Sequence, residues 1–184
     1  MRVAITGRSM RFDFFESLSP EEAKTFFDRF LEVESARVHE VLKQCSSEGV
    51  PANFGIDSVA PFMRWVAARL KTVPTAPDTQ LPTWIRETDS YAKNLFEFDE
   101  VSKILTLRAA YFLGESFVRS FRNLHWTIGN SETAEANMPV IGGFQAGLEL
   151  APILITENLL RRVIAEPSKE SDIDKAVDYW VGKV

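Results

Sequence analysis

Apolar residues dominate one long stretch in the middle of the chain, residues 101–122. Wound at 3.6 residues per turn, this stretch is apolar or small around most of its circumference, which is typical of a helix buried on several sides. The exception is a charged line whose members follow each other at +7, +4 and +3 and fall within roughly 60° of arc. Its members, called the charged seam below, are Arg108, Glu115, Arg119 and Arg122. The pattern predicts a central helix with one charged seam.

Helical spacing of apolar residues predicts four further helices. The first begins at the capping box Ser19-Pro20-Glu21-Glu22, where Ser19 can accept from first-turn amides, and it continues to about Cys45. A second starts within residues 58–61, a third covers 152–164, and the last opens at Ser171. These helices surround the predicted central one.

Short β-rich segments follow the central helix. Residues 124–128 end at a Gly-Asn turn signal, and residues 139–144 and 148–150 have the same short apolar character. We expect them to form a small antiparallel sheet packed on the central helix. The predicted fold class is therefore α+β, a mostly helical single domain over residues 1–184.

Prolines interrupt the pattern before the central helix. Residues 73–83 contain three prolines and no helical period, which predicts a surface connection that could serve as a hinge. Residues 84–96 are predicted as a short helix that packs Trp84 and Leu95.

Composition and charge narrow the classes of protein. With 45% hydrophobic residues in 184, core material is plentiful and disorder of the whole chain is not expected. The formal net charge is -5 and no long basic block occurs, so we expect no nucleic-acid partner. A single cysteine, Cys45, indicates a reducing compartment. No signal-peptide hydrophobic region precedes the first charges, and no apolar run approaches the roughly 20 residues that span a bilayer. We expect a cytoplasmic protein with no membrane partner.

Signatures of metal, nucleotide and nucleophilic chemistry are weak. His39-Glu40 begins as a zinc-protease helix does, but position 43 is a lysine, so the second imidazole ligand is missing. No glycine-rich phosphate loop is complete, and Cys45 falls on the apolar side of its helix. We expect no metal, no cofactor and no catalytic nucleophile.

The charged seam and the residues just beyond it are the candidate site. Glu115 lies four residues before Arg119 and seven after Arg108, so its carboxylate could bridge two guanidinium groups. One interpretation is a solvated edge whose ion pairs contribute a few tenths of a kcal/mol each. The other is a partly desolvated array that lines a groove for an acidic peptide or a carboxylate, with His125 and Trp126 at its mouth.

The order of motifs also resembles a group of known proteins. Tyr111-Phe112-Leu113-Gly114-Glu115 is followed by Trp126 and then by Asn137-Met138-Pro139-Val140-Ile141-Gly142-Gly143-Phe144. This order resembles small uncharacterised bacterial proteins that share a Tyr-x-Leu-Gly-Glu helix followed by a tryptophan strand. The resemblance covers about residues 101–155. It implies bacterial origin and a binding role, because some small proteins of that kind are thought to act as immunity or accessory factors near toxin genes.

Three functions remain open from the sequence. The leading hypothesis is a non-enzymatic, immunity-like or accessory module that binds a protein partner, and its acidic balance would steer it toward a basic one. The alternative is a small-molecule hydrolase or transferase that uses Glu115 as acid or base with His125 assisting. A second alternative is a homodimeric scaffold whose interface contains aromatic residues of 12–15 or Trp84.

Overall fold

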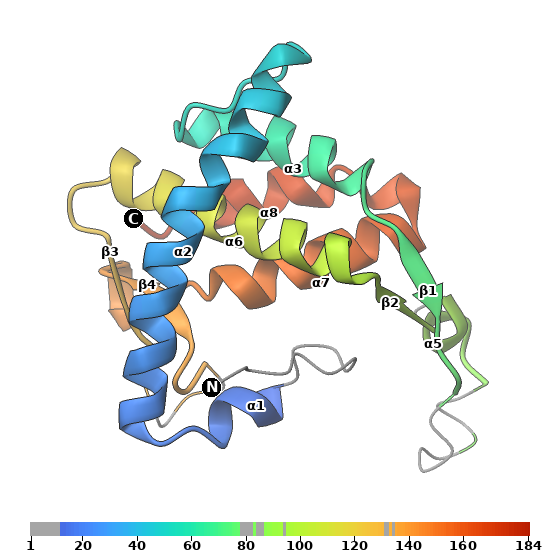
Figure 1. Cartoon of the computed structure of the whole chain (residues 1–184), viewed down its shortest axis with the longest axis horizontal. Helices are drawn as coiled ribbons and strands as arrows, with labels where there is room; N and C mark the ends of the chain where they lie inside the picture. Colours follow the sequence, from blue (N-terminus) through green and yellow to red (C-terminus); the bar gives the residue numbers. More distant parts are fainter. Residues whose placement is uncertain (1–11, 78–82, 84–86, 94, 131–132, 134) are drawn as a thin grey trace.

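A computed structural model describes residues 12–77, 83, 87–93, 95–130, 133 and 135–184 (Figure 1). Its helices are α1 (Phe12–Glu16), α2 (Pro20–Ser47), α3 (Val59–Ala67), α5 (Asp89–Lys93), α6 (Glu100–Ser120), α7 (Pro152–Ala165) and α8 (Asp172–Val181). Its strands are β1 (Thr72–Pro74), β2 (Phe96–Phe98), β3 (His125–Ile128) and β4 (Pro139–Gly142). Short 3₁₀ turns are η1 (Ile56–Ser58), η2 (Gln145–Gly147) and η3 (Pro167–Lys169). The predicted fold class, mostly helical α+β with a small antiparallel sheet, is confirmed.

Helix α2 begins where the capping box predicts. The Glu22 N–H donates to the Ser19 hydroxyl at 3.3 Å, and the Ser19 N–H donates to the Glu22 carboxylate at 2.9 Å. Pro20 occupies the first helical position, where a missing amide donor costs nothing. Satisfying these orphan donors stabilises the start of the helix by about 1 kcal/mol. The helix therefore has a fixed origin, from which its apolar face meets α6.

Helix α6 is the central element. Asp99 caps its start by accepting from the Ser102 N–H at 2.8 Å, and this hydrogen bond lowers the pKa of the Asp99 carboxyl. Helices α2, α3 and α7 all pack against α6, and α2 crosses it in Figure 1. Fully buried side chains such as Phe112 and Phe117 join the shared core. The predicted central helix is confirmed, and it ends at Ser120.

Strands β3 and β4 form the predicted antiparallel hairpin, in which Trp126 pairs with Ile141. The strand predicted at 148–150 is reduced to a single bridge between Leu150 and Ile141. Turn η2 explains the difference, because Ala146 and Gly147 adopt positive φ there and interrupt the extended backbone. The hairpin packs on α6, as expected.

Strands β1 and β2 correct two predictions. The expected surface connection 73–83 begins inside β1, whose Thr72 pairs with Phe98, and residues 78–82 lie outside the described part. The helix predicted at 84–96 is limited to α5 among the described residues and gives way to β2, while Trp84 lies outside them. Pairing with β1 makes residues 96–98 extended, and Arg161 of α7 supports them because its Nη1 donates to the Phe96 carbonyl at 2.8 Å.

None of the helices in the described part of the chain combines enough length with enough apolar character to span a bilayer.

Candidate functional site

Glu115 is the most completely engaged residue of the charged seam. Its side chain is 16% exposed. One carboxylate oxygen accepts from Arg119 Nε at 2.7 Å, which is the pair that the i,i+4 spacing predicts. The other accepts from Trp126 Nε1 at 3.2 Å. With a donor on each oxygen, Glu115 fastens strand β3 to helix α6.

Trp126 lies between α2 and α6 instead of at the mouth of a groove. Its indole stacks on Tyr111 with ring centroids 6.0 Å apart, and it meets Phe30 of α2 edge-on at 5.7 Å. Gly114 makes the room for it, because a Cβ at that position would lie 2.3 Å from Trp126 Cη2. The same Cβ would lie 3.0 Å from Pro152 Cγ. The absence of a side chain at Gly114 therefore lets both the indole ring and the Pro152 ring pack directly against the helix backbone.

Tyr111 lies at the same contact between helix α6 and strand β3, which we call the α6–β3 junction. Burial, followed by the neighbouring Glu115 carboxylate, raises the pKa of Tyr111 to about 12. The hydroxyl therefore stays protonated well above neutral pH and does not serve as a base there.

The Arg119 side chain extends from the α6–β3 junction to the surface of the protein. Its guanidinium carbon lies 4.1 Å from the centroid of the Phe54 ring, a cation–π arrangement. The His39 ring meets the same Phe54 edge-on, with centroids 6.2 Å apart. The Arg119 side chain is nevertheless 52% exposed. Stacking and the ion pair with Glu115 therefore fix the guanidinium while leaving it open to solvent.

Arg122 and His125 place two further basic side chains beyond the end of the helix. The backbone becomes extended at Phe121, with φ -133° and ψ 118°, so Arg122 leaves the helical seam that the sequence predicts. Both Arg122 and His125 are exposed. A turn at Arg122 and Asn123, closed by the Leu124 N–H donating to the Phe121 carbonyl at 3.1 Å, then leads into β3, so Arg119, Arg122 and His125 follow each other at intervals of three residues across the end of the helix. We call these three residues the basic ridge.

His125 and Glu115 are not brought together. Successive side chains of a strand point to opposite faces, and Trp126 occupies the face toward Glu115. His125 lies on the other face, where its Nδ1 is 3.4 Å from the Asn123 carbonyl oxygen. The pairing required by the hydrolase or transferase alternative is therefore absent from this arrangement.

Arg108 lies at the other end of the seam and faces α2. In the described part of the chain no ion pair joins Arg108 to Glu115. Its electrostatic neighbour is Glu34, which is 6% exposed and whose pKa is raised by burial, against the attraction of Arg108 and Arg37. Glu34 Oε2 and Arg108 Nε are both buried without a hydrogen-bond partner among the described residues. The charged seam is thus divided, because Arg108 lies beside the buried Glu34 of α2 whereas Arg119 and Arg122 are exposed.

Sequence reasoning missed Glu34, although a signal was present. Glu34 lies four residues after Phe30 and four before Val38, in the middle of the buried stripe of α2. A charge on an apolar stripe indicates a charged partner across the interface.

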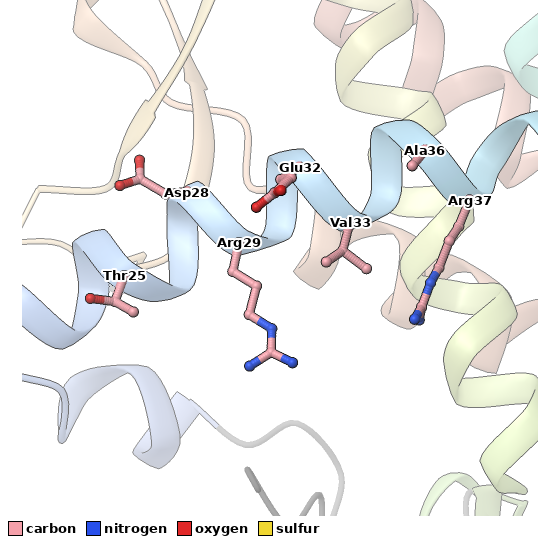
Figure 2. A pocket seen from close by; sticks show the side chains of 7 residues that line it. All are labelled: Thr25, Asp28, Arg29, Glu32, Val33, Ala36 and Arg37. Carbon is pink, nitrogen blue, oxygen red and sulfur yellow. The ribbon is translucent and has the colours of Figure 1, made fainter. Parts of the chain in front are cut away.

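The outward face of α2 lines an open hollow of about 580 Å³ (Figure 2). Arg29, Val33 and Arg37 point to one side of the helix, and Asp28 and Glu32 lie toward the other. Because one helix supplies all of the described lining, with acids and bases mixed, these groups do not converge on a common point. The hollow therefore offers no assembled catalytic set.

Other candidate chemistry is similarly accounted for. Within the described residues, no three His, Cys, Asp or Glu side chains lie together as a metal-binding group. Cys45 is fully buried, and burial raises the pKa of its thiol. Of the aromatics considered for a dimer interface, Phe15 is buried and Phe14 is 38% exposed, while Trp84 lies outside the described residues.

Comparison of the chain with protein-family models, curated proteins and solved structures finds no match in any of the three.

Proposed function

We propose that this chain is a cytoplasmic, non-enzymatic protein-binding module of the immunity-like or accessory kind, which receives an acidic segment of a partner on the basic ridge. One observation carries the proposal: Glu115, the acid that pairs with Arg119, has a donor on each oxygen, whereas Arg119, Arg122 and His125 are exposed. A site whose basic side chains are exposed to solvent, and whose neighbouring carboxylate already has its hydrogen-bond donors, is suited to binding anions.

The chemistry of Arg119 supports an acidic ligand. Its described hydrogen bond uses Nε, so the two terminal nitrogens remain available for a bidentate contact with a carboxylate. The Phe54 ring and Glu115 hold the guanidinium in place before binding, which reduces the entropy lost when a ligand is captured. The formal net charge of -5 repels an acidic partner at long range and favours a basic one, so an acidic segment gains its attraction only locally, at the basic ridge.

The opposite placement of His125 and Glu115 about β3 favours binding over the hydrolase or transferase alternative. Acid–base catalysis needs both groups within hydrogen-bond reach of one substrate proton or of each other.

The experiment that tests this function is quantitative capture from a native bacterial extract at low and moderate salt. Arg122→Glu reverses an exposed charge for which the described structure records no contact, so the fold should be retained. Lys93→Glu makes the same change on α5, away from the ridge. We expect the wild-type chain and Lys93→Glu to capture a stoichiometric partner whose yield falls with salt, and Arg122→Glu to lose most of it. Equal capture by both variants, or no stoichiometric partner at either salt level, contradicts the proposal.

A further inference from the structure

A second hollow, of about 320 Å³, lies between the loop after β3, turn η2 and the end of α8. It is more enclosed than the hollow along α2. Its described lining comes from three separate segments and includes Glu135, Leu148, Glu149 and Trp180. A volume of this size falls at the lower end of the range of small-ligand pockets. None of the residues singled out from the sequence as a candidate site lies in it.

Two half-buried glutamates, Glu135 and Glu149, line this pocket, and its described lining residues include no lysine or arginine. Neither Glu135 nor Glu149 forms an ion pair within the described part of the chain, which contains ten other such pairs. Glu149 is held in place because one of its oxygens accepts from the Asn130 N–H at 3.2 Å. Its second oxygen has no donor among the described residues. Negative charge in a partly enclosed site attracts a cation more strongly than it would on open surface.

An aromatic and apolar wall faces the same space. The Trp180 indole is fixed by edge-on contacts with Phe144, at 5.1 Å, and with Tyr179, at 5.5 Å. Indole is the aromatic group that attracts cations best. Leu148, from the segment after η2, adds an aliphatic surface to the lining. The wall therefore suits a cation carried on an apolar stem.

We propose that this pocket binds an organic cation on a methylene stem, either an alkylammonium group, as in lysine side chains and free polyamines, or an alkylguanidinium group, as in arginine side chains. The carboxylates of Glu135 and Glu149 receive the charged head, and Trp180 and Leu148 cover the methylene stem. The site has the opposite charge preference to the basic ridge and does not depend on the function proposed for it.

The test is titration of the ¹⁵N-labelled full chain by NMR, followed at the Trp180 indole N–H, which a Trp180→Phe spectrum assigns. The probes are N-acetyl-lysine methylamide, N-acetyl-arginine methylamide and spermidine. N-acetyl-norleucine methylamide is the uncharged control with a similar stem. We expect saturable shifts with millimolar or tighter dissociation constants for the cations and at least tenfold weaker binding of the norleucine probe. Spermidine binding at least tenfold tighter than either amino-acid probe assigns the site to free polyamines, and the reverse order assigns it to a side chain.

The variants Glu149→Gln and Glu135→Gln identify the groups responsible. The amide introduced by Glu149→Gln keeps an oxygen that can accept from Asn130, so the loop should stay in place while the charge is lost. Each variant should weaken cation binding at least fivefold. Asp178→Asn removes one charge two residues from Trp180 without touching the pocket lining, and it should change binding less than twofold. Equal binding of the norleucine probe, wild-type affinity in both glutamine variants, or no shift up to tens of millimolar cation overturns the proposal.

Discussion

Replacing Gly114 with alanine tests the junction that fastens β3 to α6. The added Cβ would lie 2.3 Å from Trp126 Cη2 and 2.4 Å from Cζ2, so the indole must move. Movement strains the packing against Tyr111 and Phe30, a cost of about 1–3 kcal/mol for an overfilled core. It also breaks the hydrogen bond from Trp126 to the charged Glu115, which contributes about 1.5–3 kcal/mol.

Helix propensity acts in the opposite direction. Alanine is favoured over glycine inside a helix by about 1 kcal/mol, so a tolerant site would be stabilised by the change. Steric cost and the lost hydrogen bond exceed that gain. We therefore expect Gly114→Ala to lower the free energy of unfolding by about 3 kcal/mol, which corresponds to roughly 9 °C in Tm for a chain of this length.

Urea unfolding followed by tryptophan fluorescence and far-UV circular dichroism measures this loss. Gly182→Ala is the matched control, because the nearest atom to its Cβ would be the Asp178 carbonyl oxygen at 3.4 Å, an ordinary contact. In a Trp126→Phe background the distal ring atoms are gone, so the penalty of Gly114→Ala should fall by at least about half. A Gly114→Ala protein as stable as the wild type would show that the Trp126 indole does not occupy the space beside Gly114 in solution.

Three further perturbations test other contacts described above. The pKa of Tyr111 is about 12 in the folded protein against 10.0 for the free side chain. The stability that Tyr111 contributes is therefore present in full below pH 10 and is lost as the pH rises toward 12. In urea titrations between about pH 9 and 11, Tyr111→Phe should lose less stability than the wild type. Glu34→Leu removes a buried carboxylate and Arg108→Leu removes one of the two cations that offset it, so each should lower the free energy of unfolding by at most about 1–3 kcal/mol, and the double variant should cost less than the sum of the two single ones in the same assay. Arg161→Met removes the ion pairs to Glu97 and Glu157 and the hydrogen bond to the Phe96 carbonyl, so hydrogen exchange of the backbone amides of residues 96–98 should accelerate at least about tenfold. Arg162 makes none of these contacts and pairs with Asp172, so Arg162→Met should leave this exchange unchanged.

Elements with strong local signals were predictable from the sequence. The capping box at Ser19 fixes the start of α2, and the apolar stretch 101–122 identifies α6 without any knowledge of its neighbours. Strands β1 and β2 carry no comparable signal. Each has three residues, the two pair with each other across more than 20 residues of sequence, and β2 also accepts a hydrogen bond from Arg161, more than 60 residues away. Contacts of that range do not appear in a local pattern.

The candidate site was predictable in part for the same reason. The Glu115–Arg119 pair follows from helical spacing alone. A helical wheel also places Arg122 on the seam, but only while the helix continues, and the chain turns toward β3 at Phe121. The bond from Trp126 to Glu115 depends on the space left by Gly114 and on the packing of a strand onto a helix. Residue spacing in the sequence predicts neither the space beside Gly114 nor the packing of β3 on α6.

The measurement that tests the proposed binding role most directly is an NMR titration of the full chain with a short peptide of alternating Glu and Ser. We expect saturable shifts at Arg122, His125 and the Arg119 guanidinium, which weaken as salt is raised and disappear in Arg122→Glu. Absence of any shift at these three residues, or shifts that persist unchanged in Arg122→Glu, would contradict that role.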